Sequence, residues 1–187
     1  RPVSSAASDV YKRQSVYLFT EAIIKYGSEE MKKDFLPKLV SGDVIGTLAV
    51  TEDLFAPSKD NIKLSCESGK INGKKIAVPD ASIATHALVV AKSDKGVCLQ
   101  VADLSHEGVS IEHQENIDES RGHFSITFDG VDTQAIGDDI SGWDIYESII
   151  NQAAVLFAYE QIGGSQASLD MAVNYAKERY AFGRPIG

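Results

Sequence analysis

A polar loop that follows an apolar run is the stretch of this sequence best placed to bind a ligand. Residues 44–50 are apolar at nearly every position, which predicts a strand covered on both faces. Thr51 and Glu52 follow this run, and turn-forming residues continue to Asp60. The backbone N–H groups freed in such a loop could meet an anion. An ordinary exit from a strand into a loop is the simpler alternative for the same residues.

The other residues capable of chemistry show no arrangement typical of a site. Four histidines lack the spacing of metal ligands, so we predict no metal site: His86, His106, His113 and His123. The only two cysteines, Cys66 and Cys98, lie inside alternating apolar segments, which indicates core residues in a reducing compartment. Arg179 lies near the end of a helical pattern, where a solvated cation is favourable in any protein.

The composition is that of a globular protein and argues against two classes of partner. The 187 residues include 43% hydrophobic side chains and carry a formal net charge of −9. This charge argues against a surface for nucleic acid or for an anionic membrane. No apolar run approaches the length of a membrane span, and the first residues lack a signal-peptide pattern, so we expect a soluble, cytoplasmic protein.

Helices are expected before the apolar run. Residues 1–14 show no periodicity that the next segment continues, so we expect a disordered leader that need not belong to the natural gene product. Apolar residues then recur at helical spacing from Ser15 to Tyr26. Ser28 is placed to cap a second helix, which Pro37 ends or kinks, and Gly42 closes the short segment that follows.

After the apolar run, the period of the pattern changes to two, which is typical of strands with one wet face. Asn72-Gly73 is the best short hairpin signal in the chain. The expected strands, separated by turn residues, are 62–67, 87–91, 97–102, 109–115 and 124–128. Short strands at this spacing predict an antiparallel sandwich or barrel.

From Trp143 to about Tyr180 the period is helical again, which predicts one long helix, or two that break near Gly163-Gly164. Residues 153–167 are rich in Ala and Gly, which suits close packing in a helix bundle. A lone helix of this length cannot bury its apolar stripe. We therefore expect the chain to be a fragment or to need a partner.

Four segments resemble successive landmarks of the acyl-CoA dehydrogenase family. They are GSEEMKKDFLPKLVSGDVIGTLAVTE, INGKKIAVPDASIATHALVVAK, SITFDGVDTQAIGDD and YAKERYAFGRPIG. Their order and spacing match over residues 16–187. The resemblance implies an α+β multidomain fold: 15–43 would end an N-terminal helical domain, 44–139 would form a middle β domain, and 140–187 would begin a truncated C-terminal four-helix domain.

The resemblance also implies an activity. Members of the family dehydrogenate an acyl-CoA thioester between its α and β carbons: a carboxylate removes the α-proton and the β-hydride goes to N5 of FAD. Electrons then usually pass to an electron-transferring flavoprotein. The family forms homo-oligomers or heteromers in which FAD lies at a subunit interface.

Some residues match the positions with which the family binds FAD. Val50 and Thr51 match a pair that contacts the flavin, with the Thr51 hydroxyl and N–H at the pyrimidine edge of the ring. Val78 falls in the segment that covers one flavin face. Arg179 matches the arginine that reaches the FAD diphosphate of a neighbouring subunit, and Phe182 the aromatic residue beside it.

Three departures from the family pattern concern the same site. Residues 53–60 form a longer and bulkier loop than the compact family loop, and residues 77–80 replace Trp-Ile-Thr-Asn, so a stacking ring and a hydroxyl are lost. Ala153 occupies the position where some members carry a helix-borne catalytic glutamate. Most members take their base from a loop that would lie beyond Gly187, so the sequence names no catalytic residue.

Two functions are therefore open. The first is a diverged acyl-CoA dehydrogenase. The second is a catalytically silent member that completes the FAD site of a partner chain, a division of labour known among heteromeric members that act on steroid-type thioesters. A β-sandwich binding module outside the family would leave the order of the four segments unexplained.

Overall fold

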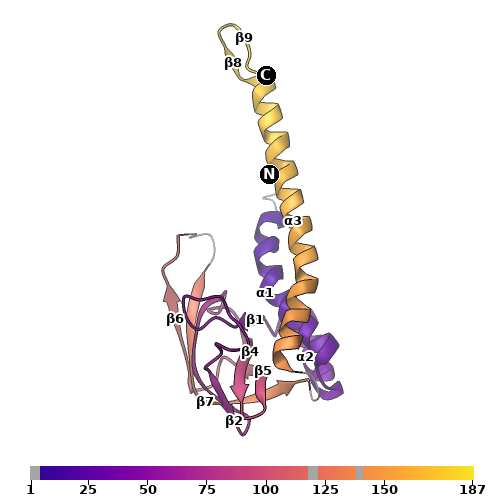
Figure 1. The fold of residues 1–187 in the computed structure, drawn as a ribbon. Coiled ribbons are helices and arrows are strands. Elements are labelled where there is room, and N and C mark those ends of the chain that lie inside the picture. The colour runs from indigo at the N-terminus through magenta and orange to yellow at the C-terminus, as the bar shows by residue number, and fades with distance from the viewer. Residues whose placement is uncertain (1–4, 118–121, 138–140) are drawn as a thin grey trace. The chain divides into compact units, whose positions relative to one another are not determined.

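The computed structural model describes residues 5–117, 122–137 and 141–187 (Figure 1). The chain divides into two compact units, Arg1–Ile150 and Asn151–Gly187. The first unit contains two helices, a sheet and the first residues of a third helix. The second unit contains the rest of that helix and a short hairpin. The division into three domains expected from the resemblance stays a prediction.

Two helices open the first unit. α1 spans Ser5–Tyr26 and α2 spans Glu29–Ser41. The Ser28 hydroxyl caps α2 as predicted, because its Oγ accepts a hydrogen bond of 3.1 Å from the Met31 N–H. Gly42 ends the helix in the left-handed conformation with φ of 84°.

The structure corrects two expectations about these helices. Residues 5–14 belong to α1 and are helical, so the disordered leader expected over 1–14 is wrong for this part, while residues 1–4 lie outside the described residues. Pro37 lies inside α2 and does not end it. Proline disfavours a helix interior because it lacks an N–H and its ring meets the preceding turn, yet α2 continues to its Gly42 cap.

The helices pack against the sheet through aromatic side chains. α1 contacts both α2 and the first strand. The Phe19 and Phe35 rings meet edge to face with centroids 5.9 Å apart, and the Phe35 and His86 rings are 5.2 Å apart. Phe19 and Phe35 are both buried. These contacts fix the helical segment to the start of the strand that begins at His86.

Seven strands of the first unit form one sheet. They are β1 (Gly46–Ala49), β2 (Ser65–Glu67), β3 (Lys70–Pro79), β4 (His86–Ser93), β5 (Gly96–Asp103), β6 (Val109–Gln114) and β7 (His123–Ile136). The pairings β4–β2, β2–β3, β3–β7, β7–β5 and β5–β4 return to their starting strand, so five strands close a barrel. β1 extends it beside β4, and β6 beside β7.

The barrel confirms the predicted fold class, with one addition. Most pairings are antiparallel, but β1 and β2 both run parallel to β4. The barrel is filled by an apolar cluster: Ala49, Leu64, Cys66, Ile71, Val78, Ala81, Ala87, Val89, Ala91, Ala102, Leu104, Phe124, Ile126, Phe128 and Val131. Since the side chains of all five barrel strands meet there, the barrel is a packed core and not a pore.

The predicted hairpin at Asn72-Gly73 is wrong. These two residues lie inside β3, where the register against β7 shifts between Ile71 and Gly73. The turn from β2 to β3 is instead made by Ser68 and Gly69, both with positive φ (51° and 78°), as a tight two-residue hairpin requires. Asn72 has another role, because its Oδ1 accepts a 2.7 Å hydrogen bond from the Gly130 N–H.

One continuous helix, α3 (Gly142–Glu178), begins in the first unit and forms most of the second. It passes through Gly163-Gly164 without a break. A hairpin of β8 (Tyr180–Ala181) and β9 (Arg184–Pro185) follows it. None of the helices in the described ranges is long and apolar enough to cross a membrane.

The close approach of α1 to β1 predicts the effect of a single methyl group. A Cβ added at Gly46 would overlap the ring of Phe19, which is fully buried and cannot move aside. We expect Gly46→Ala to destabilise the protein by about 1–3 kcal/mol in chemical denaturation, because the core would be overpacked. Gly163→Ala is the control, since an added Cβ there meets nothing. Equal stability of Gly46→Ala and wild type would contradict this packing.

The partial burial of His86 predicts that the stability of the protein depends on pH. Burial lowers the pKa of His86 from its ordinary 6.5, an effect that Lys38 reinforces and the Asp103 carboxylate opposes. As the pH falls through 6.5, the unfolded chain takes up this proton before the folded chain does, so stability is lost on acidification.

The measurement is urea unfolding of wild type and His86→Gln between about pH 7 and about pH 5. We expect the variant to lose less stability over this range than wild type. His113→Gln, which replaces an exposed ring on β6, is the matched control and should keep the wild-type slope. An unchanged slope in His86→Gln would exclude His86 as the source.

Candidate functional site

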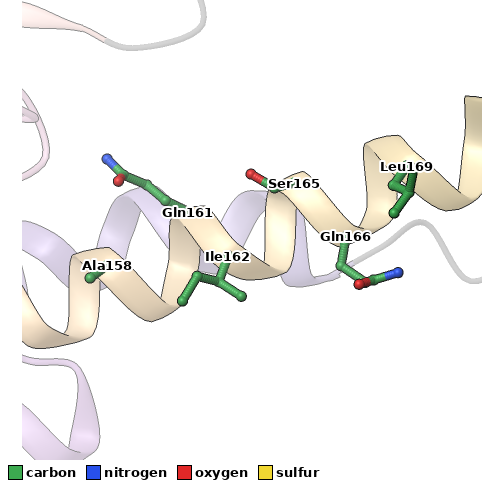
Figure 2. Close-up of a pocket in the computed structure, with 6 residues that line it drawn as sticks. All are labelled: Ala158, Gln161, Ile162, Ser165, Gln166 and Leu169. Atoms are coloured by element: carbon green, nitrogen blue, oxygen red, sulfur yellow. The ribbon is translucent and has the colours of Figure 1, made fainter.

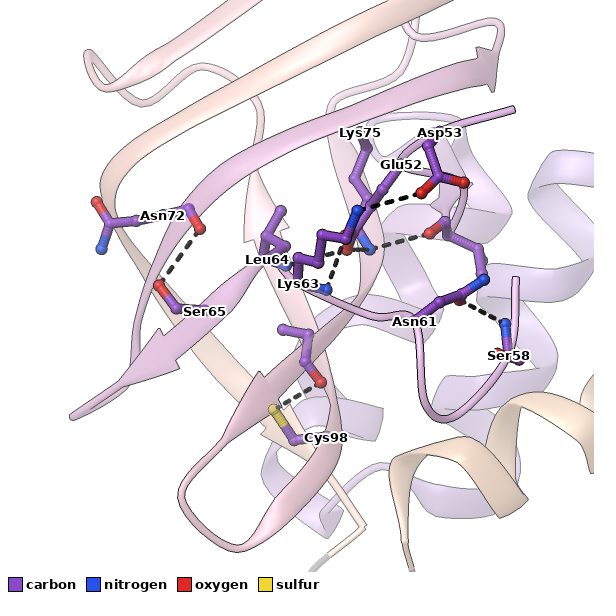
Figure 3. Close-up of polar contacts among 12 residues, drawn as sticks. Glu52, Asp53, Ser58, Asn61, Lys63, Leu64, Ser65, Asn72, Lys75 and Cys98 are labelled. Carbon is purple, nitrogen blue, oxygen red and sulfur yellow. Dashed lines mark hydrogen bonds and ion pairs between the residues drawn. The ribbon is translucent and has the colours of Figure 1, made fainter. Parts of the chain in front are cut away.

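A buried ion pair fixes the loop that the sequence indicated as a ligand site (Figure 3). The Lys75 side chain on β3 is 0% exposed, and its Nζ lies 2.6 Å from Glu52 Oε1. The same Nζ donates a hydrogen bond of 2.9 Å to the Val50 carbonyl oxygen. Lys75 therefore bonds to the residue on each side of Thr51.

Glu52 also fixes the far end of the loop. Its Oε2 accepts a 2.7 Å hydrogen bond from the Lys63 N–H, and its Oε1 accepts one of 3.0 Å from the Leu64 N–H. One carboxylate thus joins the end of β1, the entry to β2 and the middle of β3. Such a set of charge-assisted bonds is what allows a charge to be buried here.

The electrostatics of this pair are those of a buried cation. Burial lowers the pKa of Lys75 from its ordinary value of 10.5, and the hydrogen bond and charge of Glu52 oppose that shift. Removing Glu52 would take away the largest effects that oppose burial, and burial disfavours the ammonium form.

Thr51 lies where the end of β1 meets β3. Its carbonyl oxygen accepts a 2.8 Å hydrogen bond from the Ile76 N–H on β3. The Thr51 side chain is half-buried, and among the described residues its hydroxyl has no hydrogen-bond partner. Val50 is buried before it. The hydroxyl of Thr51 is therefore available to a ligand, while its backbone is fixed.

The end of β3 lies beside this position and is irregular. The register of β3 against β7 shifts between Lys75 and Val78, and Ala77 has a φ of 52°, rare for a residue with a side chain. The Ala77 N–H is held by a 2.7 Å hydrogen bond to Gln114 Oε1. Thr47 on β1 donates a bond of 2.7 Å to the Pro79 carbonyl oxygen. These bonds hold Ala77 against β6 and Pro79 against β1.

Val78 faces away from a ligand. Its side chain is 1% exposed and belongs to the barrel core. Any contact of Val78 with a cofactor would therefore come from its backbone. Ala77, by contrast, is exposed at the bulge.

The bulky loop that follows Glu52 is held by its own polar groups. Asp53 Oδ1 accepts a 2.9 Å hydrogen bond from the Phe55 N–H, and Asn61 bonds to both the Ser58 N–H (2.7 Å) and the Ala56 carbonyl oxygen (2.9 Å). At its tip, two apolar side chains project into solvent, Leu54 at 99% and Phe55 at 75% exposure. The loop thus presents apolar surface at a fixed place.

Arg179 and Phe182 lie in the second unit, at the hairpin after α3. The Arg179 carbonyl oxygen accepts a 2.9 Å hydrogen bond from the Ile186 N–H, which closes the hairpin around the Phe182-Gly183 turn. Both side chains are exposed. An arginine and an aromatic ring at the end of a rigid helix are suited to an anionic group beside an apolar one.

Other features of the chain are not suited to chemistry. Ala153 is buried and carries no functional group. α3 has a shallow concavity lined only by its own residues: Ala158, Gln161, Ile162, Ser165, Gln166 and Leu169 (Figure 2). One face of one helix cannot enclose a small molecule. Within the described ranges, no three His, Cys, Asp or Glu side chains gather as metal ligands would.

The two cysteines are free thiols of the barrel, as predicted from their segments. Cys66 is a member of the core cluster, and Cys98 packs against it. Burial raises the pKa of Cys66 to about 11. Because the thiolate is the nucleophilic form, Cys66 is a core residue and not a reactive one.

Sequence reasoning located Thr51 and Glu52 but missed Lys75. The sequence offered one signal for Lys75, namely a lysine in a strand segment together with an acidic loop that could pair with it. Alternation alone does not assign Lys75 to the interior, because the register shifts on both sides of it change which side chains point inward. Gln114, which holds Ala77, was missed as well.

Comparison with known proteins gives a consistent result. No family model matches the chain. It is 28% identical over 196 residues to an acyl-CoA dehydrogenase of Bacillus subtilis, covering 97% of this chain and 52% of that protein. A solved glutaryl-coenzyme A dehydrogenase in complex with glutaryl-CoA is 26% identical, with a TM-score of 0.87 over 98% of this chain and 50% of that one. The chain is thus similar to acyl-CoA dehydrogenases in both sequence and fold.

A third comparison concerns the fold. A glutaryl-CoA dehydrogenase from Mycobacterium smegmatis, solved in complex with FADH2, is 24% identical, with a TM-score of 0.81 over 91% of this chain and 46% of that chain. The chain spans about half the length of the relatives it matches. These similarities agree with the resemblance seen in the four sequence segments and with the helices, barrel and long helix of the structure.

The buried pair predicts a contrast between two lysines. Lys75→Met would leave the Glu52 carboxylate without its cation, and we expect a loss of about 3–5 kcal/mol in the free energy of unfolding. Lys63→Met is the matched control, because Lys63 is exposed and its 3.3 Å ion pair with Asp53 is solvated. We expect no measurable change there. Equal effects of the two substitutions in urea denaturation would contradict the importance of burial.

Proposed function

We propose that the protein containing this chain is an FAD-dependent acyl-CoA dehydrogenase, which oxidises an acyl-CoA thioester between its α and β carbons. The observation that carries the proposal is the end of β1, where Thr51 offers a hydroxyl without a partner among the described residues, beside the exposed bulge at Ala77. In a chain of this family, the position corresponds to the edge of the flavin ring.

The residues present fit an FAD. Thr51 would bind the pyrimidine edge of the ring through its hydroxyl and N–H, with Val50 packed before it. Arg179 would pair with the diphosphate bound mainly by a neighbouring subunit, and Phe182 would lie beside it. When bound, the flavin accepts a hydride from the substrate. The chain's own residues bind and orient the ring, and the base that takes the α-proton is not among those assigned.

Several parts of the proposal follow from the family. The substrate would be an acyl-CoA, and electrons would leave through an electron-transferring flavoprotein. An oligomer with FAD at the subunit interface is supported by Arg179 and Phe182, exposed on a hairpin where they could reach a second chain. Two free cysteines support a cytoplasmic location, because reducing compartments keep thiols unpaired.

A catalytically silent subunit is the second candidate, and three observations favour it. Ala153 occupies the position of a helix-borne base. Ala77 replaces a stacking aromatic residue at the bulge, and Leu54 with Phe55 occupies a loop that is compact in the family. A subunit of this kind would lend Arg179 and Phe182 to a partner that performs the chemistry.

Flavin content separates the two candidates. The complete reading frame is expressed and purified, the protein is denatured, and released flavin is measured by absorbance per mole of chain. About one FAD per chain supports a self-sufficient dehydrogenase. Flavin that appears only when a neighbouring gene product is co-expressed supports the silent subunit. No flavin under either condition contradicts both.

The role of Arg179 gives a prediction for binding. Loss of a charge-assisted contact to the diphosphate is worth about 1.5–3 kcal/mol, so we expect Arg179→Ala to weaken FAD binding by about tenfold to a hundredfold. The measurement is titration of the apoprotein with FAD by flavin fluorescence. Lys177→Ala is the control, because it removes an exposed cation two residues away, in the last turn of α3. Equal FAD affinity of the two variants would exclude Arg179 from the site.

A further inference from the structure

We infer that Lys75 and Glu52 are positioning residues: their buried ion pair acts as a clamp that holds Thr51 and the β3 bulge at Ile76-Ala77 in one fixed arrangement for the flavin ring. The inference rests on the proposed function and deepens it. Neither residue needs to touch the cofactor. They act through the backbone on either side of Thr51.

The contacts around Thr51 converge on Lys75 and its neighbour in β3. Lys75 Nζ donates to the Val50 carbonyl oxygen at 2.9 Å and to Glu52 Oε1 at 2.6 Å, so one cation bonds to both neighbours of Thr51. The Thr51 carbonyl oxygen itself is held at 2.8 Å by the Ile76 N–H, the residue next to Lys75. Three consecutive residues are therefore tied to two consecutive residues of β3.

β1 and β3 are not paired strands. The ladder places β1 beside β4, and β3 lies between β2 and β7. Without the clamp, the relative position of the β1 end and the β3 bulge would depend on the Thr51–Ile76 bond and the Thr47–Pro79 bond. A ligand that contacts both segments needs their spacing fixed, because a shift of a few tenths of an ångström lengthens a hydrogen bond to the ring.

The clamp is isolated from solvent. Lys75 is 0% exposed and the Glu52 side chain 9% exposed. A pair of this kind resists salt and moves little, whereas the neighbouring Lys63–Asp53 pair, with Lys63 at 73% exposure, is screened. The chain thus contains two ion pairs in one loop, of which only the buried one joins β1 to β3. They provide a matched comparison.

The test separates positioning from stability. In the double variant Glu52→Gln/Lys75→Met, no charge remains buried, and the single amide oxygen can still accept from one of the Lys63 and Leu64 N–H groups. Since apolar or neutral replacement of a buried pair is often neutral for stability, the double variant should unfold at a urea concentration close to that of the control Asp53→Asn/Lys63→Met. The two bonds from residue 75 to the neighbours of Thr51 are nevertheless lost.

We expect the double variant to bind FAD about tenfold more weakly than the control, measured by fluorescence titration of the apoprotein. The visible absorption bands of its bound flavin should also shift, because the hydrogen bonds at the ring edge change. A variant with the affinity and the spectrum of the control would overturn the inference, since the pair would then serve folding alone.

Two further outcomes concern a double variant that does not fold and a protein that binds no FAD. If the double variant does not fold, Lys75→Arg replaces it: the guanidinium keeps the charge but moves the donors, so a shifted flavin spectrum supports the clamp and an unshifted one overturns it. If wild type and the control bind no FAD, alone or with a co-expressed neighbour, the proposed function fails and the inference fails with it. FAD binding by both, unchanged in the Lys75 variants, overturns only the inference.

Discussion

The site of this chain depends on one buried cation. Lys75 is buried in the first unit, where an unpaired ammonium would be costly. Glu52 must therefore lie against it. Because Glu52 also accepts from two backbone N–H groups at the entry to β2, this requirement fixes the ends of a loop whose middle has only local hydrogen bonds. The loop is ordered because the buried charge of Lys75 has to be paired with Glu52.

The barrel explains why the pair brings distant parts of the chain together. Closure through β4, β2, β3, β7 and β5 places β1 at one margin, where it extends the sheet through parallel pairing with β4 alone. The end of β1 is thus not covered by a further strand. It can meet the bulge of β3, whose irregular register exposes Ala77 while Val78 stays in the core. Bulges of this kind commonly occur beside binding sites.

The proposed site keeps its framework while its surface departs from the pattern of acyl-CoA dehydrogenases. Thr51 and Glu52 are held by the barrel, whereas the residues proposed to lie nearest a flavin are small at Ala77 and bulky at Leu54 and Phe55. A change of this type alters what is bound, or which chain does the chemistry, without altering the fold, because the covering residues lie outside the packed core.

Local patterns in the sequence were enough to predict the fold class, the resemblance to acyl-CoA dehydrogenases and a strand that ends before Thr51, because strand alternation, helical periodicity and four ordered motifs are local signals. They did not determine the roles of Asn72, Pro37 or Lys75. Asn72-Gly73 has hairpin chemistry, yet the turn formed at Ser68-Gly69, and Asn72 bonds to Gly130 far along the chain. Whether Lys75 is solvated or buried was decided only by the tertiary structure, because register shifts on either side of it set its direction, and its partner Glu52 belongs to another strand's loop.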